Sequence, residues 1–281
     1  MATQADDHAP PPTKPVYQYD ERLREHLTQV TALRQFSESS TEEQGLFKTG
    51  TDRTHVLETK ETIFCVQGGG QPFDTGYMSA GSEKAGKFNV EAVRYGANGR
   101  ILHFGHFADG SSHFEAGEMV EQHIDGARRD LNSRIHTAGH CIGLAVRRLI
   151  EKTPDLEVTE LKAQHYPDSS FVEFKGIIDG KHKDAIQAQA SSFVTDALPV
   201  KLYWHEPEKL NEKGVITAEG MPIVAGLDGK VRVVDIVGAG AYPCGGTHVP
   251  DTSFVGGITI RNIKRQKGVS KISYAITENE G

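Results

Sequence analysis

One long stretch of the chain alternates apolar and polar positions with the period of an α-helix. Between Ala127 and Ile150 the apolar residues are spaced by four and three in alternation, which makes one narrow stripe at about 100° per residue. The stripe consists of Leu131, Ile135, Ala138, Ile142, Ala145 and Leu149. The pattern predicts an amphipathic helix over residues 127–150 that packs on a core, and a second helix is expected over residues 183–197.

Shorter stretches on both sides of this helix predict β-strands. After it, several segments alternate apolar and polar residues with period two: FVEFKGII, VKLYW, VRVVDIV, GGITIRNI and KISYAI. Before it, HVLETKETIFCVQ and RILHFGHF are strand-like and are separated by glycine clusters, whereas residues 21–35 fit either a short helix or a long strand. The first half therefore predicts a small β-rich domain.

Together these elements predict an α+β fold in two domains. We expect a small N-terminal β-barrel domain over residues 16–117, then an α+β domain over residues 118–281 with the long helix packed on an antiparallel sheet. The polar, glycine-rich stretch ADGSSHFEAGE is expected to be the exit from the first domain. Residues 1–15 contain several prolines and are expected to form a disordered tail.

Composition narrows the classes of function. The chain is 37% hydrophobic and 25% charged, as in a soluble globular protein, and no apolar run approaches the roughly 20 residues of a membrane span. Its 31 basic and 38 acidic residues give a formal charge of −7, which opposes indiscriminate binding to DNA or other nucleic acid. Three widely spaced cysteines and the lack of an apolar signal segment favour a cytoplasmic protein without disulfides.

Two histidines on the predicted helix form half of a candidate metal site. His136 and His140 are four residues apart and point about 140° and 180° away from Leu131, opposite the apolar stripe. Gly139 and Gly143 flank this face, and since each interior glycine costs roughly 1 kcal/mol, we expect another segment to approach the helix closely there. The face is therefore expected to be covered rather than solvated.

The segment YPCGGTHVPDTSF supplies the other half of the site. Cys244 and His248 have the same spacing, but Gly245 and Gly246 place them on a turn after the strand VRVVDIV. One thiolate and three imidazoles make a tetrahedral ligand set suited to zinc, so we expect one Zn²⁺ per chain. A site with four protein ligands is closed, whereas a loosely held His248 would leave an open position for water, and the sequence leaves both alternatives open.

The two ligand motifs and a third stretch resemble a known family. IHTAGHCIGL and CGGTHV resemble the paired zinc motifs of the editing domain shared by alanyl- and threonyl-tRNA synthetases, and GGGQPFDTG resembles the glycine-rich motif of the free-standing alanyl-tRNA editing proteins, the AlaX group. The resemblance covers nearly all of the chain after the tail. It implies a β-barrel domain followed by a zinc-binding editing domain, and Gly139 departs from the larger residue that the family commonly has there.

The resemblance also implies an activity and site residues. The family hydrolyses serine, and in some members glycine, from mischarged tRNA(Ala) at its acceptor end. Carried over by motif, Gln71 is a catalytic polar residue that reaches the pocket from the first domain. The zinc ligands are those named above, and the residues expected to line the substrate pocket are Gly69, Gly70 and Thr247. His165, in the segment QHYPDSS outside these motifs, is a further candidate for the pocket.

Basic residues are candidates for contact with tRNA. Arg129 and Arg147 each lie seven residues outside the histidine pair and share its helix face, although such long side chains also commonly extend into solvent. A second basic cluster, in the segment RNIKRQKGVSK, includes Arg261, Lys264 and Arg265. Two other functions stay open: a tRNA- or synthetase-associated zinc module without hydrolytic activity, and a zinc hydrolase of another small ester or amide.

Overall fold

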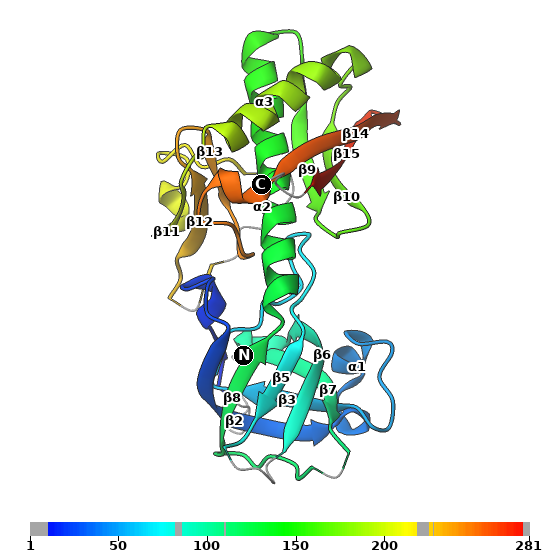
Figure 1. Cartoon of the computed structure of the whole chain (residues 1–281), viewed down its shortest axis with the longest axis vertical. Coiled ribbons are helices and arrows are strands. Elements are labelled where there is room, and N and C mark those ends of the chain that lie inside the picture. Colours follow the sequence, from blue (N-terminus) through cyan, green and yellow to red (C-terminus); the bar gives the residue numbers. More distant parts are fainter. Residues whose placement is uncertain (1–10, 82–85, 110, 218–224, 227, 278–281) are drawn as a thin grey trace, which may run out of the picture. The chain divides into compact units, whose positions relative to one another are not determined.

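The computed structural model describes residues 11–81, 86–109, 111–217, 225–226 and 228–277 (Figure 1). Its contacts divide the chain into two compact units. The first consists of residues 1–67 and 73–126, and the second of residues 68–72 and 127–281. The short segment Gly68–Pro72, which we expected within the first domain, therefore groups with the second unit. Among the described residues, no helix has the length and apolar character that a membrane span requires.

The first unit is a closed β-barrel with the strand order β2-β3-β7-β6-β5-β8. The segment 21–35, which fitted either a short helix or a long strand, contains the strand β2. The core of the barrel unit contains buried side chains such as Leu57, Met78, Phe88 and Ile101. The elements of this unit are β1 (Lys14–Pro15), β2 (Glu25–Gln35), α1 (Thr41–Gly45), β3 (His55–Thr59), β4 (Glu61–Thr62), β5 (Gly76–Ser79), β6 (Lys87–Tyr95), β7 (Ile101–Phe107) and β8 (Met119–Ile124).

Two expected boundaries of this unit were wrong. The barrel does not end at residue 117, because β8 pairs with both β2 and β5 and closes it. The polar stretch 108–118 is thus the connection from β7 to β8. The expected tail of residues 1–15 is also too long: its first ten residues lie outside the described part, but Lys14 and Pro15 form β1 on β4, where the backbone N–H of Lys14 donates to the carbonyl of Lys60 at 3.0 Å.

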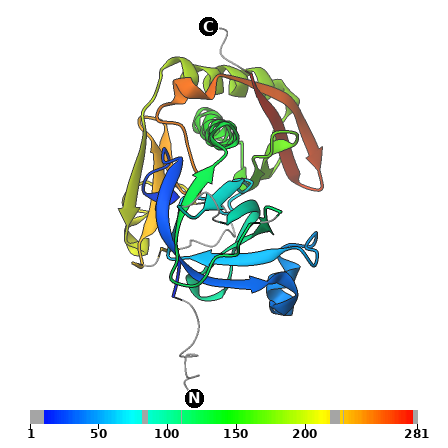
Figure 2. The same ribbon diagram turned by 60° about the horizontal axis from the view of Figure 1, so that its bottom comes forward.

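The second unit surrounds one long helix, α2, with two sheets and a second helix. Figure 2, in which α2 is seen end-on, shows α3 and the sheets on different sides of it. The sheets have the strand orders β14-β15-β10-β9 and β11-β12-β13. The elements are α2 (Gly126–Lys152), β9 (Thr159–Gln164), β10 (Ser170–Lys175), α3 (Lys183–Thr195), β11 (Val200–His205), β12 (Val231–Ile236), β13 (Gly240–Pro243), β14 (Gly257–Gln266) and β15 (Val269–Thr277).

The hydrophobic core around α2 holds most of this unit together, and a smaller cluster contains Leu210, Val215, Val231 and Val233. The core around α2 combines the apolar stripe of α2, including Ile135, Ala138 and Ile142, with side chains from β10, β12, β14, β15 and α3. The two predicted helices are present within a few residues of their expected ends, and all five predicted strands occur. The sequence analysis did not predict β9 or β13. The strand β13 is only four residues long, and β9 has Leu161 and Ala163 as its only apolar residues.

Candidate metal centre

Helix α2 presents a polar face opposite its apolar stripe. His136 is buried and His140 is partly buried, and they share this face with Ser133 and Thr137 at helical spacing. The hydroxyls of Ser133 and Thr137 donate to the backbone carbonyls one turn earlier, at 2.8 Å each. The expectation that this face is covered is therefore confirmed for His136, Ser133 and Thr137, which are all nearly inaccessible to solvent.

The loop after β13 carries the other two donors to this face. Arg232 on β12 fixes the loop, since one of its guanidinium nitrogens donates to the carbonyl oxygens of Cys244 at 2.6 Å and Gly246 at 2.9 Å. Gly246 must lack a side chain, because a Cβ there would lie 2.5 Å from Nδ1 of His136. The loop thus approaches the helix through a glycine, and it brings Cys244 and His248 beside the histidine pair.

The four predicted ligands converge on one point. The donor atoms of His136, His140, Cys244 and His248 lie within 4.8 Å of one another. Sγ of Cys244 is 3.5 Å from Nε2 of His136 and 3.3 Å from Nε2 of His248, and neither ring nitrogen of His140 has a hydrogen-bond partner among the described residues. Three imidazoles and a thiol in this arrangement could hold one metal ion, and they provide the donor types that zinc prefers.

Hydrogen bonds behind two of the histidines turn their Nε2 atoms toward this centre. Nδ1 of His136 donates to Oε1 of Gln71 at 2.7 Å, and Nδ1 of His248 donates to the hydroxyl of Thr137 at 3.2 Å. Such partners fix the tautomer and orientation of metal-binding imidazoles. The structure therefore holds the rings ready for coordination through Nε2.

Gln71 is fully buried and its amide links the two halves of the centre. Besides accepting from His136, its Oε1 accepts from the backbone N–H of Thr247 at 2.9 Å, and its Nε2 donates to the hydroxyl of Thr247 at the same distance. That hydroxyl is also 2.7 Å from Oγ of Ser133. Gln71 and Thr247, expected to act on substrate, thus use these polar atoms to join the loop to α2.

The electrostatics of the centre keep its imidazoles neutral. The pKa values of His136 and His248 are well below the usual value for histidine, mainly because both rings are buried. The neighbouring histidines and Arg232 lower these pKa values further. Burial, with a smaller effect from Arg232, lowers the pKa of His140 to about 4. Because a neutral imidazole is the form that binds metal, this environment favours coordination at neutral pH.

His165, the fourth residue expected in the substrate pocket, lies against the metal centre. Its ring stacks on that of His136 with centroids 4.3 Å apart, and its Nδ1 donates to the hydroxyl of Tyr274 at 2.7 Å. Burial lowers the pKa of His165 to about 3, so the ring is neutral. Its Nε2 accepts no hydrogen bond among the described residues, so this nitrogen can accept one from a ligand.

Two glycines make room for the His165 ring. A Cβ at Gly139 would lie 2.6 Å from Nδ1 of His165 and 2.8 Å from the hydroxyl of Tyr274. A Cβ at Gly70 would lie 2.4 Å from the carbonyl oxygen of Ala163 and 3.1 Å from Cδ2 of His165, and the carbonyl of Gly70 accepts from the His165 backbone N–H at 2.8 Å. The close approach predicted at Gly139 is confirmed. Gly69 has a φ of 56°, and a Cβ there would meet no atom within 4 Å.

Replacing Gly139 by alanine should therefore destabilise the protein. In most helices this change is stabilising by about 1 kcal/mol, but here the added methyl group displaces the His165 ring at a cost of about 1 to 3 kcal/mol. The measurement is urea unfolding followed by circular dichroism. The matched control is Gly45→Ala at the end of α1, where a Cβ meets nothing within 4 Å. Equal effects of the two changes would show that the His165 ring is not tightly held.

The residues expected to contact tRNA lie in different environments. Arg129 is fully buried, so the expectation of a surface contact with phosphate was wrong. Arg147 is about half exposed and 3.8 Å from Glu151. Arg261, Lys264 and Arg265 are exposed on the edge strand β14, where Arg265 also pairs with Asp179 at 3.2 Å. These four exposed or half-exposed residues stay candidates.

The sequence analysis missed several residues that shape the centre. Ser133 and Thr137 carried a signal, since they continue the helix face of the histidines at spacings of three and four. Tyr242 packs its ring edge-on against His140 with centroids 4.7 Å apart, and its hydroxyl donates to Glu160 at 3.1 Å. Tyr242 and Glu160 are far apart in sequence, as are Arg232 and Tyr274 from their partners, and no local pattern marked them.

Comparison with known proteins identifies similar sequences over most of the chain. Residues 231–273, which include Cys244 and His248, match the family model of the threonyl and alanyl tRNA synthetase second additional domain. The alanyl-tRNA editing protein AlaX-M of Methanosarcina barkeri is 32% identical over 223 residues, which cover 78% of this chain and 86% of that protein. The alanyl-tRNA editing protein AlaX-L of Pyrococcus horikoshii is 28% identical over 225 residues, which cover 79% of this chain and 51% of that protein.

A second group of similar proteins is much longer. The alanine–tRNA ligase of Natronomonas pharaonis is 32% identical over 223 residues, which cover 76% of this chain but 22% of the ligase. The alanine–tRNA ligase of Halorubrum lacusprofundi is 30% identical over 219 residues, which again cover 76% of this chain and 22% of the ligase. The chain thus corresponds to about a fifth of these ligases and to most of the AlaX-M protein.

Proposed function

The chain belongs to the family of alanyl-tRNA editing proteins, and on that premise we propose that it hydrolyses the ester bond of mischarged tRNA(Ala) in trans. The proposed substrate is seryl-tRNA(Ala), with glycyl-tRNA(Ala) as a further candidate. The observation that carries the proposal is the convergence of His136, His140, Cys244 and His248 within 4.8 Å.

We propose that the metal is one Zn²⁺ ion held by these four residues. The donor set of three imidazoles and one thiol supports zinc over harder cations, which prefer oxygen ligands. The orienting bonds from Gln71 and Thr137 supply the outer support that zinc-bound histidines usually have. When bound, zinc would supply a Lewis acid that can polarise an ester carbonyl or activate water, provided that a loosely held His248 leaves a coordination position open.

An aminoacyl ester is already activated, so the protein itself has mainly to position and to discriminate. The loop carrying Cys244 is fixed by Arg232, and His136 is fixed by Gln71, so the reacting ester meets a preformed surface. In this scheme Gln71 and Thr247 position the centre through their mutual hydrogen bonds. No glutamate base of the metalloprotease type is present on α2, which agrees with an easily cleaved substrate.

Discrimination between serine and alanine is assigned to His165. The Nε2 of His165 can accept a hydrogen bond from the hydroxyl of a serine ester, whereas alanine would leave this partly enclosed nitrogen unpaired. A site that hydrogen-bonds a substrate hydroxyl rejects analogues without it much more strongly than an apolar pocket rejects an additional group. The two glycines that admit the His165 ring are therefore part of the specificity of the site.

The test is deacylation of three substrates by the purified, zinc-loaded protein: seryl-, glycyl- and alanyl-tRNA(Ala). We expect rapid hydrolysis of the seryl ester and little of the alanyl ester. His165→Ala should reduce the ratio of the two rates by about tenfold or more, since it removes the hydroxyl acceptor. The matched control is His205→Ala on the edge strand β11, which should leave the ratio unchanged.

Two results would contradict the proposal. Stoichiometric metal with no hydrolysis of any of the three esters would indicate a tRNA- or synthetase-associated module without activity. Equal hydrolysis of a serine ester that lacks tRNA would instead indicate a hydrolase of small esters.

A further inference from the structure

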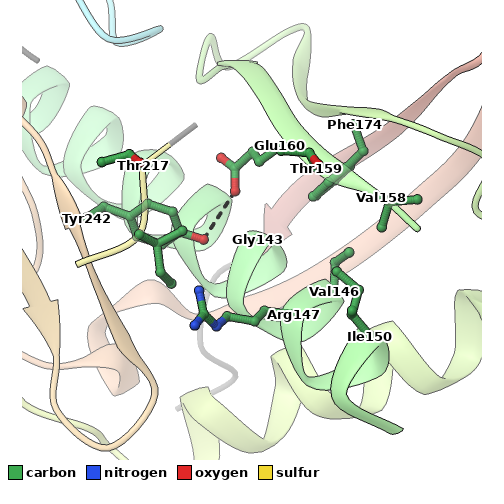
Figure 3. Close-up of a pocket in the computed structure, with 11 residues that line it drawn as sticks. Gly143, Val146, Arg147, Ile150, Val158, Thr159, Glu160, Phe174, Thr217 and Tyr242 are labelled. Atoms are coloured by element: carbon green, nitrogen blue, oxygen red, sulfur yellow. Dashed lines mark hydrogen bonds between the residues drawn. The ribbon is translucent and has the colours of Figure 1, made fainter. Parts of the chain in front are cut away.

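A pocket of about 200 Å³ lies beside the metal centre within the second unit. Its floor is α2, where Gly143, Val146 and Ile150 are separated by helical spacings, and Figure 3 shows Glu160 and Tyr242 facing each other across Gly143. The remaining lining residues are Arg147, Val158, Thr159, Phe174, Ile216 and Thr217. The pocket thus combines apolar walls with one carboxyl group, one phenol, one guanidinium group and two threonines.

Tyr242 connects the pocket to the metal centre. One side of the tyrosine packs on His140, a proposed ligand, and its hydroxyl donates to Oε2 of Glu160 in the pocket. The pocket therefore begins about one tyrosine side chain away from the proposed ligands. A ligand in it would not compete for the metal, but a substrate whose ester lies at the metal could extend into it.

Glu160 is an unusual residue for such an apolar place. Among the described residues its only hydrogen-bond partner is Tyr242, which leaves Oε1 available to a ligand. Burial, opposed by the bond from Tyr242, raises the pKa of Glu160 to about 7. A partly buried carboxyl group with one unused oxygen is costly for folding alone, and such groups gather where a ligand supplies the missing partner.

We propose that this pocket binds the terminal adenosine of the tRNA substrate, with Glu160 bonding the exocyclic amino group of the adenine. The inference rests on the proposed function, because it names the part of that substrate that the pocket receives. A flat purine suits a pocket of this volume whose walls are Val146, Ile150, Val158 and Phe174. A carboxyl oxygen can accept a hydrogen bond from the amino group at C6 of adenine. Guanine has a carbonyl oxygen at that position and cannot donate this bond.

Arg147 completes the match to a nucleotide. Its guanidinium lies on the pocket wall, and its contact with Glu151 is a surface pair at 3.8 Å. Exposed pairs of this kind contribute at most about 1 kcal/mol, so Arg147 is free to turn to a phosphate group. The pocket therefore offers a partner for each end of a nucleoside phosphate: apolar walls and Glu160 for the base, Arg147 for the phosphate.

The test uses the full, zinc-loaded chain and two separate measurements. The first is equilibrium dialysis with adenosine 5′-monophosphate and, for comparison, guanosine 5′-monophosphate and free serine. We expect the adenine nucleotide to bind at least about tenfold more tightly than the guanine nucleotide, and Glu160→Gln to weaken it about tenfold. Binding of serine alone, or equal binding of both nucleotides, would overturn the inference, and this measurement does not depend on hydrolysis.

The second measurement separates binding from chemistry. For seryl-tRNA(Ala), Glu160→Gln should raise KM about tenfold with little change in kcat, while hydrolysis of serine methyl ester should stay at the wild-type rate. Glu157→Gln, an exposed position that does not line the pocket, is the matched control. Equal losses on both esters would show that Glu160 serves only the fold. Failure of the wild-type protein to hydrolyse seryl-tRNA(Ala) would instead reject the proposed function, and the dialysis would still decide the pocket.

Discussion

The Cys244→Ala protein is expected to lose its metal and, with it, at least about 100-fold in the rate of seryl-tRNA(Ala) deacylation. The physical reason is that Cys244 is the one thiol of the cluster, and its Sγ lies against Nε2 of both His136 and His248. Without it, three neutral imidazoles remain and their affinity for zinc falls sharply. Metal content after dialysis, measured by mass spectrometry, gives the first readout, and single-turnover deacylation gives the second.

The metal should also stabilise the folded chain, and this provides a third readout. Since zinc binds the folded state, saturating zinc should raise the melting temperature of the wild type but not of Cys244→Ala. Cys65→Ala, at a buried cysteine in the barrel, is the control that tests loss of a thiol without loss of a ligand. A Cys244→Ala protein that keeps a full equivalent of zinc and full activity would contradict the assignment of this residue as a ligand.

The candidate metal centre was largely predictable because its four proposed ligands carry local signals. His136 and His140 are set by the period of α2, which also places them about 140° and 180° away from Leu131 in the apolar stripe. Cys244 and His248 follow a strand and contain two glycines between them, which predicts a turn. The sequence did not show that the two halves meet. That step came from matching donor types, and the structure confirms it by bringing all four donor atoms within 4.8 Å.

The barrel was harder to delimit because closure is a non-local property. The segment MVEQHI alternates buried and exposed residues as a strand does, but it follows a polar, glycine-rich stretch that looks like an exit from a domain. Only its pairing with β2 on one side and β5 on the other shows that it belongs to the barrel. The short strand β1 likewise exists because β4 offers it a partner.

Non-local contacts also explain why the environments of some charged residues could not be predicted from the sequence. Arg129 was expected to meet phosphate because it shares a helix face with the histidines, yet it is fully buried. Glu160 and Arg232 look like ordinary surface charges in the sequence, and their roles follow from contacts with Tyr242 and with the Cys244 loop. Helical period predicts which residues share a face, but it does not predict what covers that face.

Gln71→Met should weaken zinc binding by about 10- to 100-fold and destabilise the protein by about 2 kcal/mol. Methionine is about as long as glutamine and is apolar, so it can fill the space of the fully buried Gln71 side chain. It provides no amide oxygen, however, and the Nδ1–H of His136 and the backbone N–H of Thr247 both donate to that oxygen. Competition with a chelator of known affinity measures the zinc constant, and urea unfolding measures the stability.

The variant Gln71→Glu separates a positioning role from a catalytic one. Its carboxylate restores an acceptor for His136 and Thr247, so zinc affinity should recover most of the way toward the wild type. Gln67→Met, at a partly buried glutamine of the first unit, is the control for loss of a glutamine amide elsewhere. If Gln71→Met kept wild-type zinc affinity and stability but lost deacylation, Gln71 would act on the substrate directly. Its hydrogen bonds to His136 and Thr247 argue for the opposite order: the metal centre loses its geometry first, and activity falls as a consequence.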